Sequence, residues 1–284
     1  MSIRILTDSA CDFTKEEGAA LGITIIPLTV TFGNESFKDC IELTHDEFFE
    51  KLIETSELPS TSQITPYQYE QYFSEAVANG DQIICITLSS RLSGCYQSAM
   101  VAAEEFGDSI RVIDSLNACV GQRLIIERAL QLIDEGLSFD EVCNAIEQEK
   151  KNIRLIALLD TLEYLKKGGR ISSAVAAAGT LLSIKPVIAI VDGSVELLGK
   201  ARGSKNGNNK LNEFIALNGP IDFDKPCAVV YSGLSTSMLD KYLADSLSLY
   251  AGHESCFSRS SIGCAIGTHI GPGAIGAAFF CKTE

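Results

Sequence analysis

The chain has 284 residues, of which 46% are hydrophobic and 21% are charged, and it carries a net charge of -14 at pH 7. This composition excludes disordered and fibrous proteins, and the length favours two domains. Both a nucleic-acid groove and tight adhesion to an anionic membrane need clustered Lys and Arg, which an acidic chain is poorly placed to supply. We therefore expect no nucleic-acid partner and at most transient membrane contact.

The sequence also predicts where the protein works. No apolar run reaches the roughly 18 residues that a membrane span needs, and the N-terminus has no basic segment leading into an apolar stretch. The ten cysteines are scattered singly through apolar stretches such as IICITL and GAAFFCK, which is typical of reduced core residues. These features predict a cytoplasmic protein, and we expect it to be a monomer.

Metal binding has little support in the sequence. No C-x-x-C motif occurs, and the three histidines, His45, His253 and His269, lie far apart along the chain. Zinc and iron-sulfur sites usually draw their ligands from closely spaced Cys and His residues. The sequence therefore predicts no metal site.

In the first half of the chain, apolar runs alternate with capped amphipathic stretches. The capped helix starts are Thr14 with Glu17, Thr44 with Glu47, Thr65 with Pro66 and Gln68, and Ser138 with Glu141. The predicted strands are IRILTDS, ITIIPLTVTF, QIICITLS and RVIDS. Alternating strands and helices predict a doubly wound α/β domain with a mostly parallel sheet over residues 1–155.

The second half, from IRLIALLD onward, has smaller residues and more glycine. A hairpin is predicted in VIAIVDGSVELLGKAR, turning at Asp192 and Gly193. Helices are predicted near 208–217 and 235–250, with the strand CAVVYS between them, and the apolar run GAIGAAFFCK follows near the end. We interpret residues 156–284 as a second, α+β domain.

Near its end the chain contains a G-x-G-x-x-G pattern formed by Gly271, Gly273 and Gly276. A dinucleotide site needs a helix, a second strand and an acidic residue after such a pattern, but only eight residues follow Gly276. We therefore expect no dinucleotide site here. Either the glycines form a tight turn that lets the backbone pass close to something beside His269, or they form a plain loop-to-strand turn.

Two hydroxyl-rich loops offer His269 possible partners. PSTSQITP contains Thr61, and SSRLSG contains Ser93 directly after a buried strand. Open α/β sheets place ligands at the carboxyl ends of their strands, and a helix N-terminus near Ser93 would suit an anion. The alternative is that these hydroxyls only cap helices.

Arg170 lies in DTLEYLKKGGRISS, where a short helix ends at two glycines before the strongly apolar stretch SSAVAAAGTLL, predicted to be a helix. An arginine in this position is expected to be at least partly buried and hydrogen-bonded, because an unpaired buried charge is costly. It could bind an anionic ligand, or it could brace the two domains. We favour the bracing role.

Five segments, TDSACD, PSTSQ, SSRLSGCYQSA, DTLEYLKKGGRIS and THIGPGAIG, occur in this order across nearly the whole chain. Together they resemble the DegV family of bacterial fatty-acid-binding proteins. The resemblance implies a two-domain α/β fold that encloses a long acyl chain in the second domain and holds the carboxyl group near the domain junction. It implies no cofactor and no catalytic residue.

The resemblance also implies a role in phospholipid metabolism. The protein would be the binding subunit of a bacterial fatty-acid kinase and would present its bound long-chain fatty acid to a separate ATP-binding kinase subunit, which makes the acyl phosphate. By the same resemblance, Arg202 in KARGSK would lie on the surface that meets the kinase.

Matched position by position, the resemblance makes Thr61, Ser93 and His269 the residues that bind the fatty-acid carboxylate. The residues that would support this site are Ser62, Gly94, Arg170, Thr268 and Gly271.

Two positions depart from the family pattern. Cys95 stands where many members have threonine, and Ile266 stands where some have a mobile phenylalanine near the ligand mouth. The abundance of small and aliphatic residues in 171–191 and 262–280 favours these segments as cavity walls.

Two other functions stay open on the sequence alone. In a serine hydrolase, Ser93 would be the nucleophile and His269 the base, although the chain has no G-x-S-x-G elbow. Alternatively, the protein is regulatory and any bound lipid is incidental.

Overall fold

Four strands of the first half form one parallel sheet. The computed structural model describes residues 2–55, 57–172, 184–250 and 252–282. In spatial order the sheet contains β2 (Thr24–Ile26), β1 (Ile3–Asp8), β6 (Gln82–Thr87) and β7 (Ile110–Asp114). The predicted parallel sheet is therefore confirmed.

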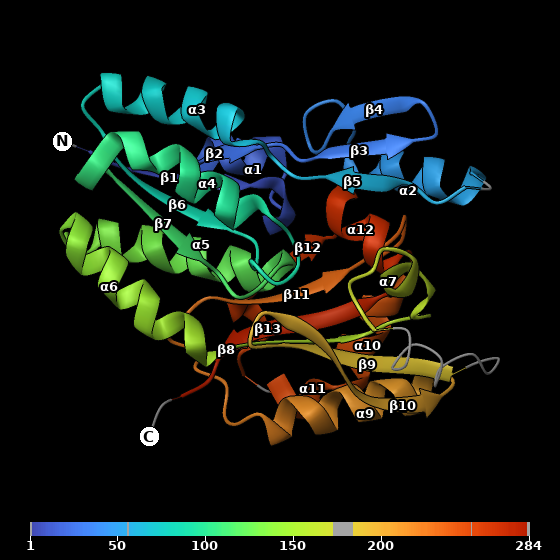
Figure 1. The fold of residues 1–284 in the computed structure, drawn as a ribbon. Helices are drawn as coiled ribbons and strands as arrows, with labels where there is room; N and C mark the ends of the chain where they lie inside the picture. The colour runs from blue at the N-terminus through green and yellow to red at the C-terminus, as the bar shows by residue number, and fades with distance from the viewer. Residues whose placement is uncertain (1, 56, 173–183, 251, 283–284) are drawn as a thin grey trace.

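Helices cover both faces of this sheet (Figure 1). The first-half helices are α1 (Lys15–Leu21), α2 (His45–Glu54), α3 (Pro66–Ala78), α4 (Cys95–Ala103), α5 (Cys119–Asp134) and α6 (Phe139–Glu149). Helices α3 and α4 pack on one face, and α5 and α6 pack on the other. All four predicted capping boxes are present, at the starts of α1, α2, α3 and α6. Short 3-10 turns follow β1, α4 and α6, namely η1 (Ser9–Cys11), η2 (Glu104–Ser109) and η3 (Lys150–Asn152).

A small antiparallel sheet beside α2 corrects two predictions. Its strands in spatial order are β4 (Glu35–Lys38), β3 (Thr29–Phe32) and β5 (Ser60–Ser62). The predicted single strand ITIIPLTVTF is divided into β2 and β3 around Pro27, which has no N–H for a sheet ladder. PSTSQ was predicted as a loop, but Ser60–Ser62 pair with β3 as an edge strand.

The second half forms a six-stranded mixed sheet. In spatial order it contains β10 (Ser194–Arg202), β9 (Ile184–Val191), β8 (Ile153–Leu158), β13 (Ile275–Phe280), β11 (Cys227–Tyr231) and β12 (Phe257–Ser261). The predicted hairpin is confirmed as β9 and β10, with positive φ at both Asp192 and Gly193. Only the β11–β12 pair is parallel.

The helices of the second half are α7 (Glu163–Lys167), α9 (Ser204–Leu217), α10 (Ser237–Asp245), α11 (Leu247–Tyr250) and α12 (Cys264–Ile270), with the 3-10 turn η4 (Glu254–Cys256). Helices α9 to α11 agree with the two predicted helical regions. Helix α12 was not predicted, and it contains Thr268 and His269. The helix predicted in SSAVAAAGTLL falls almost entirely in 173–183, outside the described residues.

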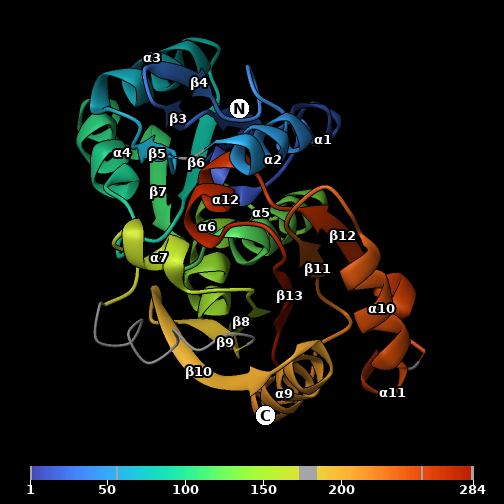
Figure 2. The same ribbon diagram turned by 90° about the vertical axis from the view of Figure 1, so that its right-hand side faces the viewer.

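The two large sheets are stacked with helices between and outside them (Figure 1). Helix α5 packs against β1 and β6 of the parallel sheet and against β8, β11 and β13 of the mixed sheet. Helix α12 leaves the mixed sheet and contacts α2, β3 and β5 of the first half as well as α7 (Figure 2). The fold is thus α/β, as predicted, while the domain boundary at residue 155 stays a prediction.

Candidate functional site

An apolar cavity of about 210 Å³ lies where the parallel sheet faces the mixed sheet. Residues that follow the carboxyl ends of β1, β6 and β7 line it, including Ala10, Leu88 and Ala118. In the order β2-β1-β6-β7, the chain runs from β1 to β2 in one direction and from β6 to β7 in the other, so the strand order reverses between β1 and β6. Parallel α/β sheets bind ligands at the carboxyl ends of strands beside such a reversal, which makes this cavity the candidate site.

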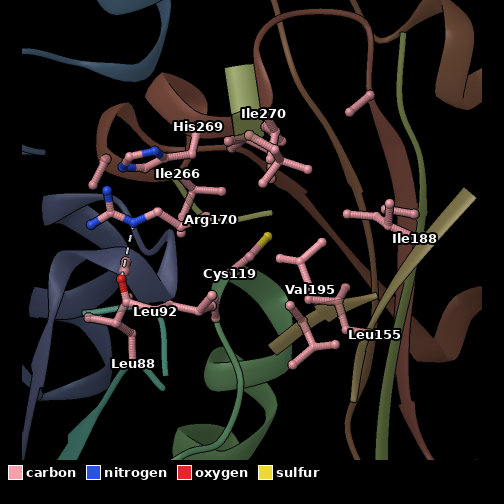
Figure 3. A pocket seen from close by; sticks show the side chains of 18 of the residues that line it. Leu88, Leu92, Cys119, Leu155, Arg170, Ile188, Val195, Ile266, His269 and Ile270 are labelled. Carbon is pink, nitrogen blue, oxygen red and sulfur yellow. Dashed lines mark hydrogen bonds between the residues drawn. The ribbon is translucent and has the colours of Figure 1, made fainter. Parts of the chain in front are cut away.

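Most of the cavity wall is hydrocarbon (Figure 3). Leu155, Ile188 and Val195 project from β8, β9 and β10, and Ile266 and Ile270 project from α12. Figure 3 shows the strand residues facing His269 and Arg170 from across the cavity. Such a wall suits an apolar ligand, and it includes parts of the two segments predicted as walls, 171–191 and 262–280.

The three residues predicted to bind a carboxylate all line this one cavity. Thr61 reaches it from β5, Ser93 from the loop before α4, and His269 from the last turn of α12. The Thr61 Oγ1 and His269 Nε2 atoms lie 2.9 Å apart and share a hydrogen bond. The fold therefore brings together residues up to 208 positions apart, while their role as carboxylate ligands stays a prediction.

The imidazole of His269 is held in an environment that disfavours its charged form. Burial, and secondarily the positive charge of Arg170, lower the pKa of His269 to about 4. Its buried Nδ1 has no hydrogen-bond partner in the described part of the chain. Figure 3 shows the Arg170 guanidinium beside the ring. His269 is therefore a neutral imidazole at physiological pH, and one hydrogen-bonding nitrogen is unused.

This environment predicts a specific pH dependence of stability. The unfolded state takes up a proton on His269 near pH 6.5, whereas the folded state does so only near pH 4. Acid therefore favours unfolding across this window, by up to about 1.4 kcal/mol per pH unit and about 3 kcal/mol in total. His269→Gln removes this contribution. The difference between the wild-type and variant free energies of unfolding should fall from pH 6.5 to pH 4 in urea titrations; a constant difference would contradict a neutral His269.

Ser93 lies both at the start of a helix and in the cavity lining, while its role as a carboxylate ligand stays a prediction. Its Oγ accepts a hydrogen bond from the Cys95 N–H at 3.3 Å, at the start of α4, and it also lines the cavity. Gly94, the N-cap residue of α4, is packed against Gln63, because an added Cβ would overlap the Gln63 side chain. The predicted supporting residue Gly94 thus lets β5 and α4 approach closely beside Ser93.

Arg170 forms hydrogen bonds with both halves of the chain. Its Nε donates to the Leu92 carbonyl of the first half at 3.1 Å, and its Nη1 donates to the Gly168 carbonyl at 2.6 Å. No carboxylate among the described residues forms an ion pair with it, and its burial lowers its pKa. These contacts support the bracing role favoured on the sequence, which stays a prediction, and the guanidinium also lines the cavity.

The glycines around His269 are required by close packing. Gly271, the C-cap of α12, has φ +70°, and an added Cβ would overlap the Tyr164 ring. An added Cβ on Gly168 would overlap the His269 imidazole. The positive φ of Gly271 and of Gly273 supports the predicted tight turn, although His269 lies on a helix and not on a loop.

Four predicted residues lie outside the cavity lining, namely Gly271, described above, and the three that follow. Ser62 is exposed on β5, next to Thr61. Thr268 is buried and donates to the Cys264 carbonyl at 2.9 Å, so it belongs to the hydrogen bonding of α12 itself. Arg202 is exposed at the end of β10.

Sequence reasoning missed other residues near the site. Gln63 lines the cavity, and its Nε2 donates to Ser98 Oγ at 3.2 Å. The side chains of Asp12 and Asp39 are buried and accept hydrogen bonds from the start of α12. Gln63 and Asp12 stand within the recognised segments PSTSQ and TDSACD, whereas Asp39 has no signal in the sequence.

The described part of the chain offers neither a metal site nor a membrane-spanning helix. Within 2–55, 57–172, 184–250 and 252–282, no group of three or more His, Cys, Asp or Glu residues could hold a metal ion. Over the same ranges, no helix has both the length and the apolar character needed to cross a bilayer. Eight of the ten cysteines are buried, Cys281 is half-buried and Cys256 is exposed, so the prediction of core cysteines holds except at Cys256.

Fold and site together define an α/β protein with two large sheets, in which an apolar cavity ends at a small set of polar side chains. Residues 2–282 match the family described as "Uncharacterised protein, DegV family". The chain belongs to the DegV family.

Curated relatives span the whole chain. The DegV domain-containing protein of Caldanaerobacter subterraneus subsp. tengcongensis is 31% identical over 98% of both chains. Protein DegV of Bacillus subtilis is 32% identical over 99% of this chain and 100% of its own.

Solved structures share the fold. A DegV family protein from Thermus thermophilus, described by its fatty acid binding, has a TM-score of 0.88 and 30% identity and covers 99% of this chain and 100% of its own. DegV from Bacillus subtilis, described as a fatty acid binding protein, has a TM-score of 0.84 and 31% identity over the same shares. A stearic acid-binding protein from Eubacterium ventriosum has a TM-score of 0.86 and 29% identity over 99% of both chains.

Proposed function

We propose that this protein binds a long-chain fatty acid in the apolar cavity, with the carboxyl group at Thr61, Ser93 and His269. The observation that carries the proposal is the grouping of these three polar residues with an otherwise largely hydrocarbon wall. The fatty-acid binding described for structural relatives at about 30% identity supports it. The protein would act as a cytoplasmic monomer that needs no cofactor.

The acyl chain and the carboxyl group of the ligand would contribute differently to binding. Burial of about fifteen methylenes at about 0.8 kcal/mol each contributes roughly 12 kcal/mol before the costs of ordering. The chain therefore supplies affinity. A carboxyl group that enters an apolar cavity needs hydrogen-bond partners to offset its lost hydration, so two hydroxyls and an imidazole supply orientation.

Hydrolysis is the less favoured function. A Ser-His pair needs the serine Oγ within hydrogen-bonding distance of the base, and a third group to orient that base. Here the Ser93 Oγ hydrogen-bonds with Cys95, whereas the His269 Nε2 hydrogen-bonds with Thr61. The His269 Nδ1 has no carboxylate partner in the described part of the chain. These contacts favour binding over nucleophilic catalysis.

Two adjacent hydroxyls allow a matched test of binding. Added palmitate or oleate, at about 100 times its Kd, is expected to raise the Tm of delipidated protein by about 5–10 °C. Thr61→Val should weaken binding roughly 3- to 30-fold, because it removes a hydroxyl from the cavity. Ser62→Ala should leave binding unchanged, because Ser62 is exposed outside the cavity. Binding is measured by displacement of a fluorescent fatty acid, and the absence of any Tm shift in the wild type would refute the proposal.

The second part of the proposal is that the protein presents its bound fatty acid to a separate ATP-dependent kinase subunit. Arg202 is exposed on β10 and outside the cavity lining, so it is free of a role in lipid binding. Arg202→Ala is expected to keep fatty-acid affinity and to lower acyl-phosphate formation by the cognate kinase at limiting protein. Unchanged turnover would remove Arg202 from the partner surface.

A further inference from the structure

The segment TDSACD is left without a part in the proposed function. Of its six residues, only Ala10 lines the cavity. Its polar side chains, Thr7, Asp8, Ser9 and Asp12, are buried. Buried carboxyl groups are costly unless they are hydrogen-bonded, so the partners of Asp8 and Asp12 indicate what the segment does.

Asp8 connects the segment to the loop that contains Ser93. Its Oδ2 accepts a hydrogen bond from the Leu88 N–H at 2.7 Å, at the point where the chain leaves β6. Its Oδ1 accepts from the Ala10 N–H at 3.2 Å and from the Gln122 Nε2 at 3.1 Å. Asp8 therefore fixes the first residue of the connection between β6 and Ser93.

Asp12 and Asp39 connect the first half to the start of α12. The Gly263 N–H donates to Asp12 Oδ1 at 3.0 Å. The next two N–H groups, of Cys264 and Ala265, donate to the two carboxyl oxygens of Asp39 at 3.1 and 3.2 Å. The first N–H groups of a helix have no partner within the helix, and side-chain oxygens that accept hydrogen bonds from them stabilise this end.

Asp39 is itself held by the segment. Ser9 Oγ donates to Asp39 Oδ2 at 2.8 Å and accepts from the Leu28 N–H at 3.0 Å. The Asp39 carboxyl therefore accepts three hydrogen bonds and joins η1 to α12. It does not line the cavity.

Helix α12 joins these contacts to the site. It is only seven residues long, so its first residues and His269 lie within two turns of each other. The N–H groups at its start donate to Asp12 and Asp39. Four of its residues line the cavity, namely Ala265, Ile266, His269 and Ile270. Its middle is packed tightly against α2, since an added Cβ on Gly267 would collide with the Phe48 ring. A shift at the N-terminus therefore moves His269 relative to Thr61, which belongs to the other half of the chain.

We propose that Asp39, together with Asp12, is a positioning residue that holds α12 against the first half and so keeps His269 within hydrogen-bonding distance of Thr61. The inference rests on the proposed function for its effect on fatty-acid binding. The placement of His269 itself can be measured without any ligand.

The test uses NMR titration of the histidine side chains in the full chain, which has only three histidines. Single His→Gln variants assign the signals. In the wild type we expect His269 to titrate near pH 4. In Asp39→Ala, release of α12 should expose the ring and move its pKa toward about 6.5. Fatty-acid affinity should fall roughly 3- to 30-fold, the range for residues that act through a neighbour. Asp39→Asn keeps one acceptor oxygen and should change the His269 pKa and the fatty-acid affinity by an intermediate amount. It replaces Asp39→Ala if that variant does not fold.

Glu141→Gln is the matched control. Glu141 accepts a hydrogen bond from the Ser138 N–H at the start of α6, away from α12. This variant should leave both the His269 titration and the affinity unchanged. If folded Asp39→Asn and Asp39→Ala keep the wild-type His269 titration, or if Glu141→Gln changes it equally, the positioning role is wrong.

The two proposals fail in different ways. If the wild type binds no fatty acid but Asp39 variants still shift the His269 titration, the positioning role stands and the proposed function fails. If the wild type binds fatty acid and the titration does not respond, only the positioning role fails.

Discussion

His269→Ala is expected to weaken fatty-acid binding by roughly 10- to 100-fold, the effect of losing one hydrogen bond to a charged group. The imidazole hydrogen-bonds with Thr61 and lies close enough to Arg170 for its positive charge to lower the pKa of His269. Without the imidazole, the carboxyl group of a bound fatty acid would lose a hydrogen-bonding partner and face an empty space. Displacement of a fluorescent fatty acid measures the change in Kd.

The neighbouring Thr268→Ala is the control for His269→Ala. Thr268 lies on the same helix, but its hydroxyl donates to the Cys264 carbonyl and does not line the cavity. This variant should bind fatty acid like the wild type even if its Tm is lower. Equal weakening by both variants would mean that damage to α12, and not loss of the imidazole, reduces affinity.

Gly271→Ala is expected to lower the free energy of unfolding by about 2–5 kcal/mol. A positive-φ conformation costs a non-glycine residue about 1–2 kcal/mol, and overlap in a packed interior adds about 1–3 kcal/mol. Both effects apply here, because Gly271 has φ +70° and an added Cβ would overlap the Tyr164 ring. Urea unfolding of the variant and the wild type measures the loss.

Gly136→Ala separates the two contributions. Gly136 follows α5 with φ +88°, and nothing lies within 4 Å of an added Cβ. This variant should lose only the conformational part, about 1–2 kcal/mol. If Gly271→Ala is no more destabilising than Gly136→Ala, the close packing of Gly271 on Tyr164 contributes nothing to the free energy of unfolding.

Features determined by nearby residues were predictable from the sequence. The capping box of Thr14 and Glu17 and the hairpin turn at Asp192 and Gly193 depend on residues within a few positions of each other, and both are present. The alternation of apolar strands with capped helices likewise predicted the parallel sheet correctly. Local patterns therefore predicted the parallel sheet and its capped helices, but not the small antiparallel sheet of the first half.

Features that depend on distant contacts were missed. Strand β5 consists of three polar residues, Ser60–Ser62, with no apolar alternation, and pairing with β3 makes it a strand. Helix α12 contains Gly267 and begins without a capping side chain of its own. Its caps are Asp12 and Asp39, 251 and 225 positions away from the residues they bind. No local signal could reveal them.

The site residues likewise depend on contacts between distant parts of the chain. No spacing rule joins Thr61 to His269. The hydroxyl-rich loops offered His269 possible partners, and the resemblance to the DegV family selected Thr61 and Ser93 among them. The structure places Thr61 and His269 in contact across the two halves of the chain. It also adds Gln63 to the cavity lining, because Gly94 leaves room for the Gln63 side chain beside α4.

The most direct test of the proposed function is a crystal structure of the protein saturated with palmitate. The expected result is one acyl chain in the cavity between the parallel and mixed sheets, with carboxyl oxygens within hydrogen-bonding distance of Thr61 Oγ1, Ser93 Oγ and His269 Nε2. The contradicting result is an empty cavity, or an acyl chain whose carboxyl group lies at the far end, beside Leu155, Ile188 and Val195.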